Sequence, residues 1–443
     1  MSERGERTPG GRWQGRFFPI WSGQQVSLLG SQAAQFALVW WLTTTTGSAT
    51  VLASASLVAL LPQLLVGPIA GVFIDRWSRR RTMIVADAAI ALVSLALAIL
   101  FWTGAMRVWH VYLVLFARSL GAAFHWPAMT AATSLLVPKE YLTRVAGLNQ
   151  TMQGVVMIAG PGLGALLVSL LPLHGIMFVD VGTALFGIGP LLFVAIPELA
   201  RREHAAAGLR SLFADLAAGF AYVRAWRGLV LLSLLVLAAK LAMTPAFSLL
   251  PLLVRKVFGR GADAYGAVEM IFGLGIVAGG TLLSVWGGSK RKVVTALLGF
   301  LLLGGGFAVV GAAPVQAFWV VMAGCLILGF SIPLVDGPFF AILQGSIDPS
   351  MQGRVFSLLG ALFNLTSPLG LLAAGPLSDV VGLRVWYLAA GALCVAGAVL
   401  GLATPAILHL EEEGRRILAR AQPAPLPVAV AEGIPQGGAG SDP

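Results

Sequence analysis

Ionisable side chains stand inside several long apolar runs of this 443-residue chain, where an unpaired charge is costly. A charged residue at the centre of a membrane span costs about 2.5–3.5 kcal/mol on insertion scales, so such residues normally face a partner or a water-filled cavity. There they can carry protons or bind a charged solute. The candidates for such coupling are Arg118, Asp180, Lys240, Glu269 and Asp336.

Arg118 and His125 lie seven residues apart, which places both on one face of a helix. For Arg118 this favours a role in a cavity or in coupling over a purely structural ion pair. His125 fits a cavity wall or ordinary packing equally well. Lys240 shares a polar stripe with Thr244 and lies too deep in its run for its amine to reach the interface, so it is not expected to face lipid.

The acidic residues of these runs differ in their expected depth. Asp180 and Glu269 lie near the ends that the loop charges assign to the outside, where they could take up protons. Asp87 lies close to the inner interface and is expected to join the charges of Arg79–Arg81. Asp336 fits either group.

The first apolar run carries a polar face. At 100° per residue its polar side chains project within about 160° of arc; they are Gln24, Gln25, Ser27, Ser31, Gln32 and Gln35. Hydrogen bonding between helices is the alternative reading. Four glutamines on one face favour a wet cavity, for which the lining candidates are Gln24, Gln32, Gln35, His125 and Thr244.

A dense charge cluster interrupts the stretch "GPIAGVFIDRWSRRRTMIVAD" (67–87). Its arginines Arg79, Arg80 and Arg81 can hold a short loop on the inner side of a membrane and meet anionic lipid there. That interpretation does not explain Asp75.

The elements that position these residues follow from the composition, which is 58% hydrophobic and 11% charged. Soluble domains carry about 25% charged residues, so the sequence predicts a membrane protein with many spans. The net charge of +10 sits in short loops between spans, which argues against nucleic-acid binding. Cys325 and Cys394 fall inside apolar runs, so neither a disulfide framework nor a metal site is expected.

Twelve membrane-spanning helices are predicted, because every backbone polar group in hydrocarbon must be satisfied within its own segment. They are 17–43, 50–73, 82–103, 109–136, 148–171, 174–197, 229–253, 265–287, 293–312, 315–341, 355–376 and 386–405. Placing both termini in the cytoplasm puts 22 of the 29 basic residues on that side.

The predicted domains are an N-terminal arm at 1–16, a six-helix bundle at 17–197, a linker at 198–228, a second six-helix bundle at 229–405 and a largely disordered cytoplasmic tail at 406–443. The linker is expected to hold an amphipathic helix on the inner leaflet. Its apolar positions are Leu209, Leu212, Phe213, Leu216, Phe220 and Val223.

The two halves also repeat. Three segment pairs match at an offset near 210, including "HWPAM" (125–129) with "DGPFF" (336–340). The sequence therefore predicts a duplicated six-helix unit, with a site between two halves that move against each other.

Three motifs resemble those of the major facilitator superfamily. "GVFIDRWSRRR" resembles its loop signature, with matches at Gly71, Asp75, Arg76, Arg79 and Arg80 and with Ser78 in place of a glycine. "LFARSLG" resembles its intramembrane arginine motif. "GPGLGA" (160–165) resembles its span-five antiporter motif, with matches at Gly160, Pro161 and Gly164.

Three further segments, "FVDVGTALFGIG", "YGAVE" and "QGRVFSL", resemble the macrolide-efflux and enterobactin-exporter branch of this superfamily's drug:proton antiporters. The likeness covers roughly residues 17–405. It implies an all-α membrane protein with twelve transmembrane helices in two pseudo-symmetric six-helix bundles. It also implies that the loop-signature residues form a conformational latch with the helix that begins near Val355.

The span-five glycines have a physical reason of their own. Gly160 and Gly164 let helices approach closely, and Pro161 weakens the backbone hydrogen-bond ladder where bending is useful. An ordinary packing face is an equal alternative to a role in conformational change.

No phosphate-binding loop and no H-E-x-x-H motif occur, so an ion gradient is the remaining energy source. One proton crossing about 100 mV releases about 2.3 kcal/mol, enough for a roughly 50-fold solute gradient. The sequence predicts a transporter and not an enzyme, without cofactor or metal, that exports amphipathic small molecules such as drugs or siderophores by alternating access with proton coupling. It is expected to be a monomer in the plasma membrane that contacts lipids.

An importer or facilitator of a metabolite, siderophore or lysolipid on the same fold is the alternative. A non-transporting receptor or a membrane enzyme would need a sensor domain or a catalytic constellation, and neither is visible in the sequence.

Overall fold

The computed structural model describes residues 13–197 and 209–421, except for the side chains of 68–76, 209–215, 349–350 and 417–421. The described part is helical throughout and contains no strand. The N-terminal six-helix bundle consists of α1 (Gln14–Thr46), α2 (Ala49–Arg76), α3 (Arg79–Trp102), α4 (Val108–Leu136), α5 (Leu142–Leu170) and α6 (Leu173–Phe193). The C-terminal bundle consists of α8 (Arg227–Ser248), α10 (Ala262–Trp286), α11 (Lys292–Ala312), α12 (Phe318–Ser346), α13 (Pro349–Val381) and α14 (Arg384–Ala403).

Six short elements join or flank these helices. They are η1 (Lys139–Tyr141), α7 (Leu209–Arg224), α9 (Leu250–Leu252), the π-helix η2 (Leu253–Val257), α15 (Pro405–Leu408) and α16 (Leu410–Ala421). Ten of the long helices in the described part are long and apolar enough to cross a membrane. The other two, α1 and α4, carry the glutamine face and Arg118, whose polar side chains lower the mean hydropathy of each helix.

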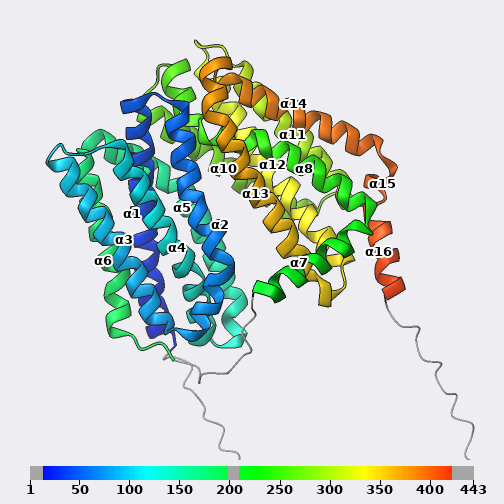
Figure 1. Cartoon of the computed structure of the whole chain (residues 1–443), viewed down its shortest axis with the longest axis horizontal. Coiled ribbons are helices and arrows are strands. Elements are labelled where there is room, and N and C mark those ends of the chain that lie inside the picture. Colours follow the sequence, from blue (N-terminus) through cyan, green and yellow to red (C-terminus); the bar gives the residue numbers. More distant parts are fainter. Residues whose placement is uncertain (1–12, 198–208, 422–443) are drawn as a thin grey trace, which may run out of the picture.

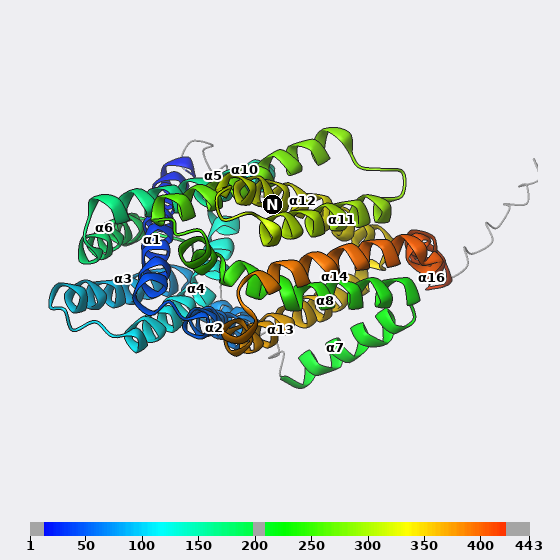
Figure 2. The same ribbon diagram turned by 90° about the horizontal axis from the view of Figure 1, so that it is seen from above.

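The two bundles lie side by side and converge at one end of the molecule (Figure 1). Each bundle pairs its helices in the same way: α1 with α5 and α6 corresponds to α8 with α13 and α14, and α2 with α4 corresponds to α10 with α12. The bundles contact each other mainly through α2 with α13 and α5 with α10, two contacts that the internal repeat makes equivalent. Figure 2 shows the same two groups of helices from above. The predicted fold of two pseudo-symmetric six-helix bundles is confirmed.

The molecule is closed at one end and open at the other. At the closed end, Thr50 Oγ1 donates to Asp379 Oδ2 at 3.1 Å, and the hydroxyls of Ser56 and Ser248 lie 2.6 Å apart. The apolar core there is continuous across both halves, whereas toward α7 and η1 it divides into one cluster for each half. We call the end that carries η1 and α7 the open end.

The linker helix packs on the protein. Val223 and Leu216 of α7 join the apolar cluster of the C-terminal half, and the backbone of Gly219 lies against the Arg354 carbonyl of α13. Phe220 points away and is exposed. The side chains of the other three predicted apolar positions, Leu209, Leu212 and Phe213, lie outside the described residues.

The predicted disordered tail differs from the structure over its first part. The helices α15 (Pro405–Leu408) and α16 (Leu410–Ala421) lie there, and the Trp226 indole donates to the Leu410 carbonyl at 3.1 Å. Glu413 accepts from the backbone amides of Arg227 and Gly228, and Glu411 accepts from Val293. Carboxylates stabilise helix N-termini, so α16 caps α8 and α11. These contacts cross long stretches of chain, which hides them from local sequence patterns.

Candidate functional site

A cavity of about 820 Å³ lies in the N-terminal bundle. Residues of α2 and α5 line it, and these are the two helices of this bundle that meet the other half, so the cavity lies on the face turned toward the C-terminal bundle. It reaches from Arg118 and Gln35 to Ser134 and Leu142 near η1. The cavity therefore extends from mid-depth toward the open end.

The polar face of α1 forms one wall of this cavity. Gln24, Gln32 and Gln35 all line it, as does His125 from α4. Thr244 lies among the lining residues of neither this cavity nor the second one described below; its hydroxyl donates to the Lys240 carbonyl at 3.1 Å and lies 3.4 Å from Ser367 Oγ. Four of the five predicted lining residues thus lie together.

Arg118 and Asp180 form a buried ion pair. Arg118 Nη1 lies 2.5 Å from Asp180 Oδ2, and the two side chains are 9% and 2% exposed. Ser94 and Ser31 donate to the same carboxylate at 2.6 and 3.0 Å, and Arg118 also donates to the Ser31 carbonyl. The network joins α1, α3, α4 and α6. Removing one partner of such a pair typically costs about 3–5 kcal/mol, because the other charge is left buried and unpaired.

A second buried carboxylate lies about two turns nearer to the open end. Gln24 Nε2 donates to Asp87 Oδ2 at 2.8 Å, and His125 Nε2 lies 3.3 Å from Asp87 Oδ1. The prediction that Asp87 joins the charges of Arg79–Arg81 is wrong, because Asp87 is directed to α1 and α4. Arg80 instead donates to the carbonyls of Leu191 and Leu192, at the C-terminal end of α6.

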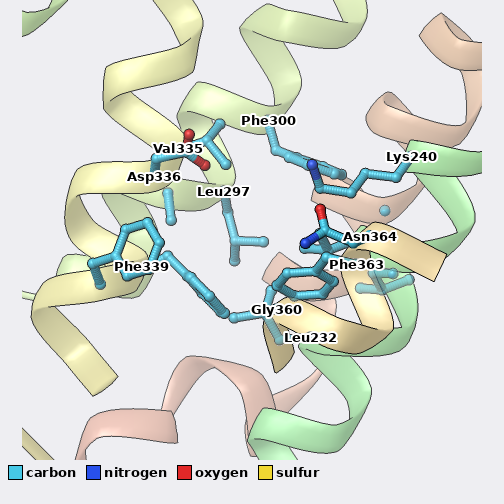
Figure 3. A pocket seen from close by; sticks show the side chains of 15 residues that line it. Leu232, Lys240, Leu297, Phe300, Val335, Asp336, Phe339, Gly360, Phe363 and Asn364 are labelled. Carbon is cyan, nitrogen blue, oxygen red and sulfur yellow. The ribbon is translucent and has the colours of Figure 1, made fainter. Parts of the chain in front are cut away.

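The C-terminal bundle holds a smaller pocket of about 250 Å³ (Figure 3). Its walls are mostly apolar, with Phe300, Phe339 and Phe363 among them. Lys240 enters from α8 and Asp336 lies on the opposite side, on α12 (Figure 3). The Lys240 amine lies 6.0 Å from the centre of the Phe363 ring.

Neither charged group of this pocket makes an ion pair within the described part of the chain. Through the internal repeat, Asp336 of "DGPFF" stands where His125 stands in "HWPAM". Each half therefore places one titratable side chain at the equivalent position of α4 or α12.

Glu269 lies in neither cavity. It accepts a hydrogen bond from the Tyr265 hydroxyl at 2.5 Å, and the Tyr265 ring stacks on Phe36 of α1 with centroids 4.9 Å apart. Glu269 is half-buried at the contact between α10 and the N-terminal bundle. In this state it belongs to the seal at the closed end.

The span-five glycines lie at close helix contacts. A Cβ on Gly160 would lie 3.0 Å from Gln32 Cβ, and one on Gly164 would lie 2.7 Å from Phe36 Cβ, so both contact α1. Gly162 faces Met270 of α10 across the bundle interface. Pro161 lies between these contacts, within α5.

For the predicted latch, the surroundings of Gly71 and the side chains of Asp75 and Arg76 lie outside the described residues. Of its remaining members, Arg80 is bound to α6 of its own half through the two carbonyls named above. The contact of the latch with α13 stays a prediction.

Asp87 and Ser94 are site residues whose part in these networks sequence reasoning missed. They are seven residues apart on α3, as are Arg118 and His125 on the adjacent α4, and the pairs Ser94–Arg118 and Asp87–His125 match in depth. That equal spacing on two consecutive spans was a signal in the sequence. No group of three or more metal-ligating side chains occurs among the described residues.

Known proteins resemble this chain over most of its length. It is 35% identical over 388 residues to Macrolide efflux protein A of Streptococcus pyogenes, covering 88% of this chain and 95% of that protein. It is 27% identical to the Multidrug efflux pump Tap of Mycobacterium tuberculosis (strain ATCC 25618 / H37Rv), covering 82% and 87%.

Among solved structures, a bacterial homolog of the human lysosomal transporter Spinster, inward-facing and unoccupied, superposes with a TM-score of 0.63 at 13% identity, covering 94% of this chain and 100% of that one. An inward-facing bacterial homologue of the iron transporter ferroportin gives 0.66 at 16% identity, covering 86% and 97%. The sequence profile of the Major Facilitator Superfamily matches residues 20–371. With two equivalent bundles of six helices, a polar cavity on the face of one bundle that is turned toward the other, and that match, the chain belongs to the major facilitator superfamily of membrane transporters.

Proposed function

We propose that this protein exports amphipathic small molecules of the macrolide kind in exchange for protons, by alternating access. The observation that carries the proposal is the 35% identity to Macrolide efflux protein A over 95% of that protein's length. The likeness spans both bundles, so it concerns the whole transporter and not a single module of it. The protein works as a monomer in the plasma membrane.

The cavity chemistry supports an amphipathic substrate. The wall on the N-terminal half offers glutamine amides and hydroxyls, while the pocket in the C-terminal half offers phenylalanine rings and two charged groups. Sites for small molecules span about 300–1,000 Å³ and combine an apolar lining with a few polar groups. A molecule with a polar face and an apolar body can use both surfaces when the halves close on it.

The charge distribution supports an orientation. Arg79–Arg81, η1 with Lys139, α7 and Lys290–Lys292 all lie toward the open end, whereas the closed end carries a smaller set of basic loops. Cytoplasmic loops are enriched in lysine and arginine. The open end then faces the cytoplasm, both termini are cytoplasmic, and the cavity is poised to receive a substrate from inside.

The test is transport of radiolabelled erythromycin into everted membrane vesicles, with and without the protein. An inside-acid pH gradient should drive accumulation, and a protonophore should abolish it. Host cells that make the protein should tolerate more erythromycin than cells without it. Accumulation that ignores the protonophore, or greater sensitivity of the cells, would contradict proton-driven export and favour uptake or facilitated diffusion.

A further inference from the structure

The N-terminal bundle holds two buried carboxylates, of which Asp87 lines the cavity and Asp180 does not. Asp180 receives hydrogen bonds from Ser31, Ser94 and Arg118, and its side chain is 2% exposed. A proton on Asp180 would leave the guanidinium of Arg118, which stays charged in proteins, without its counter-ion inside the bundle. Arg118 therefore needs Asp180 as its counter-ion.

The Asp87–His125 pair lies in the wall of the cavity and pairs its carboxylate with an imidazole in place of a guanidinium. His125 Nε2 lies 3.3 Å from Asp87 Oδ1, both residues line the cavity, and their side chains are 18% and 8% exposed. Histidine is the side chain whose charge changes nearest to physiological pH. A protonated imidazole pairs with the carboxylate, and a neutral imidazole leaves a carboxylate that still accepts from Gln24. Asp87 thus keeps the Gln24 donor with either form of the imidazole.

We infer that His125 carries the proton that drives export, with Asp87 as its fixed counter-anion and Gln24 as the residue that positions Asp87. The inference rests on the proposed proton-coupled export and names the site of its coupling. An imidazole nitrogen accepts a proton from water when the site faces outside, and returns it to water in the open cavity described here. No other reactant takes part.

The charged side chains on the helices around this pair have partners of their own. From α4, Arg118 lies seven residues away, about 10 Å along the helix, and is neutralised by Asp180 of α6. From α3, Arg80 is tied to the carbonyls of α6. From α1, the contact is the uncharged Gln24, and α2, which packs on α4, has no titratable group over 49–67.

The substrate and the proton use the same wall of the cavity, and this makes their exchange obligatory. Gln24, Asp87 and His125 all line the cavity that the substrate enters. A substrate seated against this wall and a proton on His125 compete for the same carboxylate and the same space. Because the site holds one or the other, each passage of the carrier outward with substrate is followed by a return with a proton.

The experiment compares wild type with His125→Gln and Asp87→Asn in proteoliposomes, using radiolabelled erythromycin. A pH difference of one unit supports at most about tenfold accumulation at one-to-one exchange. Wild type should accumulate erythromycin against its gradient, and both variants should only equilibrate it. Counterflow exchange, which needs no proton, should persist in His125→Gln, which keeps the Asp87 carboxylate, and so show that this variant is folded. Asp87→Asn changes the carboxylate that the substrate also uses, so its counterflow should slow. Purified wild type should also release protons on erythromycin addition in weakly buffered solution, and His125→Gln should not.

A matched control variant sharpens the result. His174→Gln makes the same substitution on a histidine that lies against Trp102, outside both cavities, and should behave as wild type. The inference is overturned if His125→Gln accumulates like wild type, or if it loses counterflow together with accumulation. Failure of wild type itself to respond to the pH gradient would instead refute the proposed function.

Discussion

At the scale of single residues, Asp180 is bound by side chains from three other helices. Substitution Asp180→Asn keeps the size of the side chain but leaves the Arg118 guanidinium buried at 9% exposure without a counter-ion. We expect the free energy of unfolding to fall by about 3–5 kcal/mol, as for other broken buried pairs. Asp87→Asn should cost less, because Gln24 can still donate to the amide oxygen.

The measurement is thermal unfolding in detergent for both variants. The double substitution Arg118→Leu with Asp180→Leu removes both charges and should recover much of the lost stability, since apolar replacements of buried pairs are often neutral or better. Equal melting temperatures for Asp180→Asn and wild type would show that the pair contributes little.

A second residue-scale prediction concerns the pocket of the C-terminal half. Gly360 lines that pocket, and a Cβ at this position would meet no atom within 4 Å. Gly360→Phe should therefore fill the pocket of about 250 Å³ without disturbing the packing of α13. We expect erythromycin affinity to fall while the melting temperature stays unchanged or rises, because glycine in a helix interior costs about 1 kcal/mol.

Binding by scintillation proximity, together with unfolding, separates the two effects. Gly305→Phe on α11 serves as the matched control, because its Cβ position is equally open and lies outside the lining of both cavities. Unchanged affinity for Gly360→Phe would place the substrate elsewhere.

The residue types of the site were readable from the sequence, whereas their pairings were not. The cost of charge in hydrocarbon singles out Arg118, Asp180, Lys240 and Asp336 without any structure. Which of them pair depends on helix rotation and depth. Arg118 meets Asp180 of α6, 62 residues away, and Lys240 meets an aromatic ring in place of an acid. Depth alone misassigned Asp87, because its direction around α3 decides its partners.

At the scale of helices, substitutions at two glycines can distinguish packing within a bundle from packing between the bundles. A Cβ on Gly164 of α5 would lie 2.7 Å from Phe36 in the same half, and one on Gly266 of α10 would lie 2.6 Å from Ala165 Cβ in the other half. Gly164→Ala should destabilise every state of the carrier, by about 1–3 kcal/mol for an overpacked core. Gly266→Ala should oppose only the state in which the closed end is closed.

Gln150 lines the cavity, so labelling of Gln150→Cys reports how often the cavity is open in each of the two glycine variants. Its reaction with a membrane-impermeant maleimide should slow in the Gly266→Ala background and stay normal in Gly164→Ala, whose melting temperature should fall instead. The two native cysteines, Cys325 and Cys394, are buried and should give little background. Equal labelling in both backgrounds would show that α5 and α10 do not separate during transport.

The long helices were predictable, because runs of apolar residues and the charges between them mark both their centres and their ends. The helices α7 and α16, outside the two bundles, were less predictable. α16 has a strongly polar sequence, and it is held by tertiary contacts of Glu411 and Glu413 with helix N-termini far away in the chain. α7 shows the expected helical spacing, yet part of its apolar face covers α13, which no local pattern distinguishes from a membrane surface.

At the scale of the whole molecule, the internal repeat explains how one protein can open at either of its two ends. The inter-bundle contacts α2–α13 and α5–α10 are equivalent under the repeat, so a rotation of the halves can open one end while closing the other with similar surfaces. In this state the apolar core is shared at the closed end and divided at the open end. Transport requires that the shared part separate.

A covalent link across the closed end should therefore arrest the cycle. Ser56 of α2 and Ser248 of α8 lie in different halves with their hydroxyl oxygens 2.6 Å apart, so cysteines at both positions place two sulfur atoms within bonding reach. We expect oxidation of Ser56→Cys with Ser248→Cys to abolish erythromycin counterflow and to leave the cavity open to labels from the open end. Reduction should restore transport, and each single variant should be insensitive to oxidant. Undiminished counterflow in a fully cross-linked sample would show that the substrate crosses without separation of the halves at this end, which alternating access does not permit.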